Sequence, residues 1–269
     1  MTRWSHGKER IIQSIPENIR VERIWFIAKT DFKRRYYGSF LGLLWALLNP
    51  ILQMLVYYTV FKVVFESREE NFPLFLFVGL IHYLYYAETS NNGMTMYHNK
   101  RHLLENIQIS HMDVYFASNL AGLFGFAFNL VIFFLFRFLF IPEAPHWDML
   151  LYPLVLFNLV IFVHASSLIL SMVWVSFRDI VHLWNIIRLA LMWLSGIFYT
   201  IDTTPGARTE VFAYLTPIAG VLINARNLLM YNEPMNWTLL AYGYLYALAL
   251  WGAAALFYHR SSRLALEKL

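Results

Sequence analysis

Six long apolar stretches, separated by shorter polar segments, dominate this chain of 269 residues. Each stretch has about 20 residues or more, enough at 1.5 Å per residue to cross the roughly 30 Å hydrocarbon core of a bilayer. Because no water is available there, a spanning segment must satisfy its backbone hydrogen bonds internally, as a helix does. The sequence therefore predicts an all-α integral membrane protein with six transmembrane helices. The predicted spans are Phe40–Phe65, Phe72–Met96, Met112–Ile141, Met149–Phe177, Ile180–Thr200 and Trp237–Tyr258.

Composition excludes most other classes of protein. The chain is 59% hydrophobic and 14% charged, whereas a soluble domain averages roughly 45–50% apolar and about 25% charged residues. A soluble core of this length could not bury so much apolar surface. The chain has no cysteine, which excludes disulfides, thiolate metal sites and cysteine nucleophiles. The basic residues lie beside the predicted spans, so nucleic acid is not an expected partner.

The distribution of Lys and Arg predicts the orientation of the chain, because loops rich in these residues stay on the cytoplasmic side. Nine of the 21 lie in residues 1–39, and others follow at positions 100, 101 and 178 and after residue 259. Only five lie at the opposite ends of the spans. We therefore expect both termini in the cytoplasm. The predicted organisation is a cytoplasmic N-terminus (1–39), a transmembrane domain (40–258) and a cytoplasmic tail (259–269).

Two further segments are predicted to lie at the membrane surface or to enter it only partly. In the N-terminus, apolar residues recur at helical spacing among basic ones, which is typical of an amphipathic interfacial helix. The alternative is a helix of a small cytoplasmic subdomain. In the connection 203–235, the apolar run Ile218–Tyr231 has 14 residues, too few to span. We expect short outer re-entrant helices there, before the last span. The N-terminal apolar residues are Val21, Ile24, Trp25, Ala28 and Phe32.

Polar and aromatic side chains form stripes along the first and fifth predicted spans. In the first span they recur every four residues, and so they share one helix face. The fifth span contains a cation, Arg188, whose burial costs at least ~2.5 kcal/mol unless it faces a partner or a wet cavity. Such stripes fit a conduit in which rings stack on sugars and amides bind hydroxyls. The alternative is polar glue between packed helices. The set is Trp45, Asn49, Gln53, Tyr57, Trp184, Arg188, Ser195 and Tyr199.

The inner segment between the second and third spans places His98, His102 and Glu105 at the spacing of one helix face. This spacing is similar to that of a metal-ligand set. The zincin motif, however, needs Glu directly after the first His, and position 99 is Asn. The next two residues are basic and would repel a cation, so we predict no metal site. A short amphipathic helix that meets a cytoplasmic partner is the favoured interpretation.

Motifs for covalent chemistry are missing from the sequence. It has no Gly-x4-Gly-Lys-Ser/Thr, so it does not bind ATP through a P-loop, and no Gly-x-Ser-x-Gly elbow. His82, Glu88 and His164 are the best acids and bases, and they form no recognisable catalytic pattern. We therefore predict no catalytic residues and expect that the chain is not an enzyme. A membrane-embedded acyl- or glycosyltransferase is the less favoured alternative, and a purely structural membrane scaffold is another.

The chain resembles the membrane subunit of ABC-2 type exporters for polysaccharides, which include the O-antigen, capsule and teichoic acid permeases of bacteria. The resemblance is strongest at Asp31–Pro50, where a basic segment runs into a Gly-x2-Trp-x4-Pro first span. Asn99–Ile107 is similar to the coupling helix of the family. Arg178-Asp179 is similar to the pair that opens the fifth span, and Thr216–Arg226 to the outer re-entrant helices.

The resemblance implies a homodimer in the bacterial cytoplasmic (inner) membrane, bound to two copies of a separate P-loop ATPase subunit that holds ATP and Mg²⁺. A lipid-linked polysaccharide would pass between spans one and five of the two copies, along the stripes described above. An ABC-2 exporter of a small lipid or a drug is the main alternative. Contact with the ATPase is implied for His98, Lys100, Arg101, His102, Leu104, Glu105, Arg178 and Asp179.

Overall fold

The computed structural model describes residues 20–36, 38–66, 71–106, 109–201 and 210–268. Within these ranges all regular structure is helical. The α-helices are α2 (Arg20–Tyr36), α3 (Trp45–Tyr58), α4 (Phe72–Met94), α5 (Met96–Asn99), α6 (Arg101–Asn106), α7 (His111–Phe140), α8 (Tyr152–Ser176), α9 (Ile180–Leu194), α10 (Glu210–Leu215), α11 (Pro217–Arg226) and α12 (Trp237–Lys268). Short 3-10 turns precede α3 at Gly42–Leu44 and α8 at Trp147–Leu151, and π-helical turns follow α3 at Thr59–Val64 and α11 at Asn227–Tyr231.

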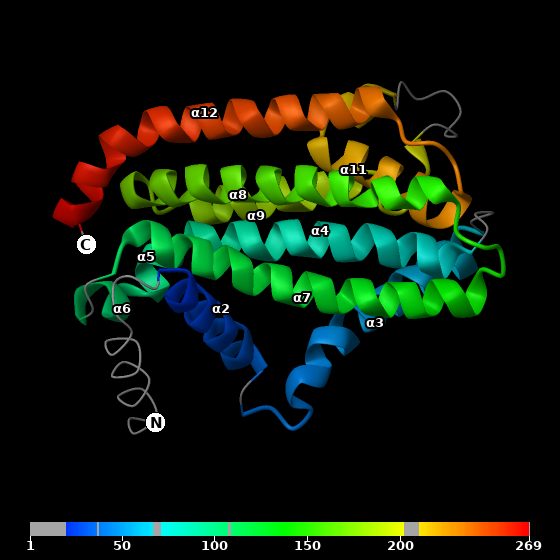
Figure 1. Ribbon diagram of the computed structural model, residues 1–269, viewed down its shortest axis with the longest axis horizontal. Helices are drawn as coiled ribbons and strands as arrows, with labels where there is room; N and C mark the ends of the chain where they lie inside the picture. Colours follow the sequence, from blue (N-terminus) through cyan, green and yellow to red (C-terminus); the bar gives the residue numbers. More distant parts are fainter. Residues whose placement is uncertain (1–19, 37, 67–70, 107–108, 202–209, 269) are drawn as a thin grey trace.

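The long helices α4, α7, α8 and α12 run side by side along the longest axis of the molecule (Figure 1). Helices α2 and α3 diverge from α7 on one side of this layer (Figure 1). The short helices α5 and α6, the start of α2 and the end of α12 lie at one end of the bundle, and α11 lies toward the other (Figure 1). The predicted inner loop and outer connection therefore occupy opposite ends of the molecule.

Four helical segments of the described chain are long and apolar enough to cross a membrane. They are Gly42–Val64, His111–Phe140, Trp147–Ser176 and Trp237–Leu256, and they coincide with the first, third, fourth and sixth predicted spans. The chain is thus a multi-pass helical membrane protein. In the second predicted span, α4 has 23 residues, but the polar residues in its second half lower its mean hydropathy.

The fifth predicted span, Ile180–Thr200, is wrong at its outer end. Helix α9 ends at Leu194 and has 15 residues. Gly196 follows with φ +71°, a left-handed conformation that commonly ends a helix. The chain then turns back, and Arg226 of α11 donates hydrogen bonds to the carbonyl oxygens of Gly196 at 2.6 Å and Ile197 at 2.9 Å.

The last helix is longer than the sixth predicted span. Helix α12 continues to Lys268, so the predicted cytoplasmic tail 259–269 extends the last helix through residue 268. No Gly or Pro interrupts the chain after Gly252, so the sequence contains no strong signal to end a helix near Tyr258. Residues 1–19, about half of the predicted cytoplasmic N-terminus, lie outside the described ranges, as do residues 202–209 in and next to the predicted re-entrant connection.

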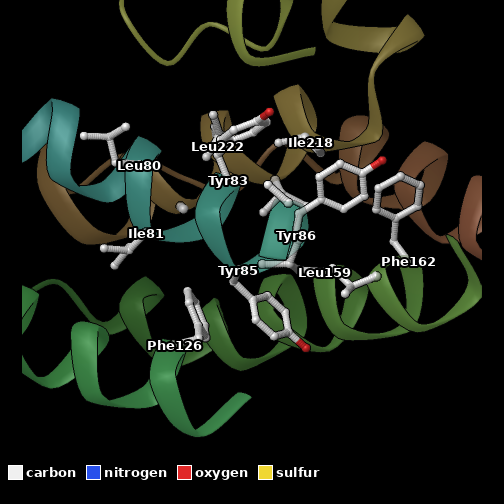
Figure 2. Close-up of a cluster of buried hydrophobic side chains, with 14 of the residues drawn as sticks. Leu80, Ile81, Tyr83, Tyr85, Tyr86, Phe126, Leu159, Phe162, Ile218 and Leu222 are labelled. Carbon is white, nitrogen blue, oxygen red and sulfur yellow. The ribbon is translucent and has the colours of Figure 1, made fainter. Parts of the chain in front are cut away.

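Helix α4 forms the centre of the bundle, and its tyrosines point in several directions (Figure 2). Tyr85 packs on Phe126 of α7 with ring centroids 5.0 Å apart. Tyr86 stacks on Phe162 of α8 at 5.4 Å. Tyr83 lies on the side of α11 (Figure 2) and donates a hydrogen bond of 2.5 Å to the carbonyl of Arg188 in α9. One helix therefore holds its neighbours on several sides.

Glycines allow α4 to approach both of its long neighbours closely. A Cβ added at Gly122 of α7 would lie 2.2 Å from Thr89 Oγ1, and one at Gly93 of α4 would lie 1.7 Å from Ser167 Oγ and 3.0 Å from Ser167 Cβ. In membranes, where helix association depends on close packing, small residues at crossings serve this purpose. The α4–α7 and α4–α8 contacts therefore depend on these two glycines.

Gly93→Ala should destabilise the bundle by about 1–3 kcal/mol, the usual cost of overpacking a close contact. Gly252→Ala in α12 is the matched control, because no atom lies within 4 Å of its added Cβ. Thermal unfolding in detergent should show a lower Tm for Gly93→Ala only. Equal Tm values for both variants would show that α4 and α8 can move apart at Gly93 without loss of stability, which would contradict this prediction.

Candidate functional site

The polar stripe of the first span lies on an open face of α3. Trp45 is 40% exposed and Asn49 is exposed, while Gln53 and Tyr57 are partly exposed. Gln53 Nε2 donates to Asn49 Oδ1 at 3.0 Å, so the two amides pair along the helix as their four-residue spacing predicts. This face is uncovered in a single chain.

Helix α3 meets the fifth span and the turn after it through aromatic and methionine side chains. The Tyr57 ring lies 4.7 Å from that of Phe198, and its hydroxyl donates to Met192 Sδ at 3.8 Å. Phe61 stacks on Phe198 at 4.9 Å. Apart from Trp184, the residues of α9 are exposed or partly exposed. The open faces of α3 and α9 are therefore neighbours.

Arg188, the cation of the fifth span, is held by neutral groups. Its Nη2 donates to Asn185 Oδ1 at 2.6 Å and its Nη1 to the carbonyl of Ala87 at 3.3 Å. It also interacts electrostatically with Glu88 of α4. A partly exposed guanidinium on a membrane helix needs water or polar protein around it. The face that carries Arg188 is therefore unsuited to lipid.

Three other residues of the predicted conduit lie off this open face or at its edge. Trp184 is buried edge-on against Tyr86 at 6.0 Å. Ser195 is fully buried and donates to the carbonyl of Leu191 at 2.6 Å. Their side chains do not reach the open face, because both point toward the interior of the bundle. Tyr199, partly exposed beyond the end of α9, donates to the carbonyl of Trp193.

A small polar cavity, which the sequence did not predict, lies where α2, α3, α4 and α7 meet. Its volume of about 30 Å³ is enough for roughly two waters. Arg35 Nη1 of α2 and Glu88 Oε2 of α4 form an ion pair of 3.3 Å at this cavity. Thr89 Oγ1 and Asn129 Oδ1 are buried there, and the described chain offers them no hydrogen-bond donor. The cavity is therefore suited to water or to a polar group.

One sequence signal could have located this cavity. An acidic residue inside a predicted span, here Glu88, marks a functional site by default because an isolated charge is costly in a membrane. Its partner Arg35 belongs to the interfacial segment, 53 residues earlier. Nothing in the local pattern pairs the two residues.

The predicted coupling segment is two short helices rather than one. Lys100 has a non-helical backbone conformation, with φ −117° and ψ 18°, and it interrupts the helix between α5 and α6. The prediction that His98, His102 and Glu105 share one helix face is therefore wrong, because the break separates His98 from the other two. Within α6, Arg101 Nε and Glu105 Oε1 form an ion pair of 2.5 Å, four residues apart. We call α5, Lys100 and α6 together the elbow.

The elbow and the start of α9 share one aromatic ring. The centroid of Trp174 in α8 lies 5.9 Å from the His98 ring and 5.6 Å from the Arg178 guanidinium. Two parts of the predicted coupling set, far apart in the sequence, are thus joined at the same end of the bundle. Asp179 is exposed beside them and Leu104 is partly buried.

Helix α2 is fixed to the bundle by aromatic contacts and ion pairs. Trp25 packs edge-on to Phe124 of α7 at 4.9 Å. Arg20 Nε and Asp113 Oδ1 of α7 form an ion pair of 2.5 Å, and Asp31 pairs with Lys100 of the elbow. Burial lowers the pKa of Lys100 to about 7, whereas the Asp31 carboxylate favours the charged ammonium. The positive charge of Lys100 is therefore favoured by its pairing with Asp31.

Comparison with known proteins identifies the family. A family model described as ABC-2 type transporter matches residues 22–230. This chain belongs to the ABC-2 type transporter family. An O-antigen export system permease protein RfbA of Myxococcus xanthus is 27% identical over 242 residues, 89% of this chain and 92% of that protein. An RfbA of Klebsiella pneumoniae with the same description is 28% identical over 220 residues, 78% of this chain and 81% of that protein.

Membership of the ABC-2 family confirms the resemblance that the sequence motifs indicated. The matched region runs from α2 to the π-helical turn after α11. It contains the stripes on α3 and α9, the elbow and the polar cavity. The chain is therefore a subunit of a transporter, and these features are the places to look for its mechanism.

If the open face of α3 meets water, a cysteine there should react with a charged maleimide. Asn49→Cys tests this face, and Leu248→Cys is the matched control, because Leu248 is an exposed, apolar residue of α12. The natural chain has no cysteine, so each variant reports on one site. In native membranes we expect labelling at position 49 only, because a thiol in lipid does not ionise; both should label after denaturation. Equal labelling of the two native variants would contradict an aqueous face on α3.

Proposed function

We propose that this chain is the transmembrane subunit of an ATP-driven exporter that moves a lipid-linked, O-antigen-like polysaccharide across the bacterial inner membrane. The supporting observation is similarity over most of the chain to relatives described as O-antigen export permeases. The aromatic and amide side chains on the open face of α3 suit a glycan. Rings can stack on sugar faces, and Asn and Gln can exchange hydrogen bonds with hydroxyls.

In this proposal the membrane domain has six spans. Helices α4 and α9 form the second and fifth spans, in addition to the four more apolar ones. Helices α10 and α11 are re-entrant on the outer side, where α11 is enclosed by α4, α8 and α12 and its buried ends need no lipid contact. Both termini lie in the cytoplasm, in accordance with the clustering of Lys and Arg.

Two copies of the chain are proposed to face each other across α3 and α9. In one copy these helices present Asn49 and Arg188 on open faces. Amides and a guanidinium turned toward lipid would be costly, whereas a water-filled seam between two copies would hydrate them. The polysaccharide would pass along this seam. Weak stacking contacts on Trp45 and Tyr57 allow a chain to slide, because a conduit must release what it binds.

The energy source is proposed to be a separate P-loop ATPase subunit, two copies of which bind the elbows of the dimer. That subunit would hold ATP and Mg²⁺. ATP can drive transport only if the ATP-bound partner favours one arrangement of the two permease copies over the other. The ATPase subunit is proposed to contact two groups of residues at this end of the bundle. One is Arg101, His102 and Glu105 of the elbow, and the other is Arg178 and Asp179 beside Trp174.

Arg188→Leu and Arg178→Glu should each reduce display of the surface glycan by about tenfold or more, equivalent to ~1.4 kcal/mol in the limiting step. Arg188→Leu removes a polar group from the conduit, and Arg178→Glu reverses a charge at the ATPase contact. Asp148→Asn, at an exposed ion pair with His146 in the outer α7–α8 connection, is the control. Full display by both arginine variants, at normal membrane levels, would remove these residues from the mechanism.

Deletion of the gene and purification of the complex test the function itself. Cells without this chain should lose their surface polysaccharide and accumulate the lipid-linked precursor on the cytoplasmic side. The chain should also purify together with a P-loop ATPase. Loss of a small lipid or of drug resistance, with surface glycan intact, would favour the alternative ABC-2 exporter instead.

A further inference from the structure

Two of the ion pairs of helix α2 lie one helical turn apart near its C-terminal end. Asp31 pairs with Lys100 of the elbow, and Arg35 pairs with Glu88 of α4 at the polar cavity. Residues four apart lie on the same face of a helix. The same edge of α2 therefore touches both the elbow and the polar cavity.

The first ion pair holds the point at which the elbow bends. Lys100 is the non-helical residue between α5 and α6, so a movement of either short helix displaces its side chain. The Lys100 and Asp31 side chains are 15% and 22% exposed. Because the pair is largely shielded from water, removal of one partner leaves a poorly solvated charge. The contact between the elbow and α2 is thus strongly dependent on charge.

The second ion pair sits beside the stripes of α3 and α9. Arg35 and Glu88 line the cavity together with Trp45 and Asn49 of the first stripe. Glu88 also interacts electrostatically with Arg188 of the second stripe. A displacement of Arg35 therefore changes the charge next to both stripes at once.

Between its ends, α2 can act as one rigid piece. It is a single helix of 17 residues, and its contacts with α7 are ring packing of Trp25 and Phe32 on Phe124 and, at its first residue, the ion pair of Arg20 with Asp113. The Arg20 side chain is 58% exposed, and an ion pair that meets water contributes little to holding a helix in place. Apolar ring contacts have little directional preference compared with charged hydrogen bonds. The helix can therefore shift along α7 while its charged contacts determine where it stops.

We propose that α2 is a connector that transmits movement of the elbow to the polar cavity, with Asp31–Lys100 and Arg35–Glu88 as its two joints. Asp31, Lys100, Arg35 and Glu88 are then positioning residues of the transport cycle. The inference rests on the proposed function, because it assigns a direction of coupling from the ATPase contact to the substrate path. It adds to the proposed function a role for α2, the transmission of movement from the elbow to the polar cavity, and the two ion pairs are the observation that supports this role.

Charge reversal and charge exchange test the first joint in the purified complex with its ATPase, reconstituted in proteoliposomes. Asp31→Lys and Lys100→Asp should each lower the glycan moved per ATP hydrolysed by about tenfold, within the usual range of coupling free energies. ATP hydrolysis itself should continue. The double variant Asp31→Lys/Lys100→Asp restores an ion pair in the opposite sense and should recover most of the coupling.

Arg35→Glu/Glu88→Arg applies the same exchange to the second joint, and Asp148→Asn is again the control. Single variants that keep the wild-type ratio of transport to hydrolysis would overturn the connector, as would a folded double variant no better than the singles. If both activities fall together and the Tm falls with them, α2 only stabilises the bundle, which also overturns it. A wild-type complex that hydrolyses ATP but moves no lipid-linked glycan would instead refute the proposed function.

Discussion

A charged or amide side chain on a membrane helix needs water or a polar partner, and this requirement organises the structure. Arg226 meets it inside the bundle by donating to the carbonyls of Gly196 and Ile197. Glu88 meets it at a small cavity with Arg35. Asn49 and Arg188 do not meet it fully within one chain, because their faces remain open. The open polar faces of α3 and α9 therefore need a second polar surface.

The central position of α4 follows from the same requirement. Its second half carries Glu88, Thr89 and Ser90, and α4 is not among the four helical segments apolar enough to cross a membrane by composition alone. Packing against neighbouring helices buries Thr89 and Ser90, whereas the exposed Glu88 pairs with Arg35. The tyrosines of α4 fill the centre of the bundle (Figure 2). The long helix with this polar half is thus the most enclosed one.

The features that depend on local pattern could be predicted from the sequence. Hydropathy locates the four most apolar spans. The segments that the sequence predicts to be inner, with Lys100, Arg101 and Arg178, do lie together at the end of the bundle that holds α5 and α6. What could not be predicted depends on contacts between distant residues or on backbone conformation. Asp31 and Lys100 are 69 residues apart. Gly196 is a helix-end signal that the sequence does contain, but only the structure shows that its left-handed conformation ends α9 there. The break at Lys100 divides the elbow without a glycine or a proline.

The most direct test of this account is transport by purified components. The chain and its ATPase partner are placed in liposomes that contain a fluorescent lipid-linked oligosaccharide, and the fraction that reaches the other leaflet is measured with and without ATP. The account predicts movement that requires both polypeptides and ATP hydrolysis. Equal movement by this chain alone, without nucleotide, would contradict it.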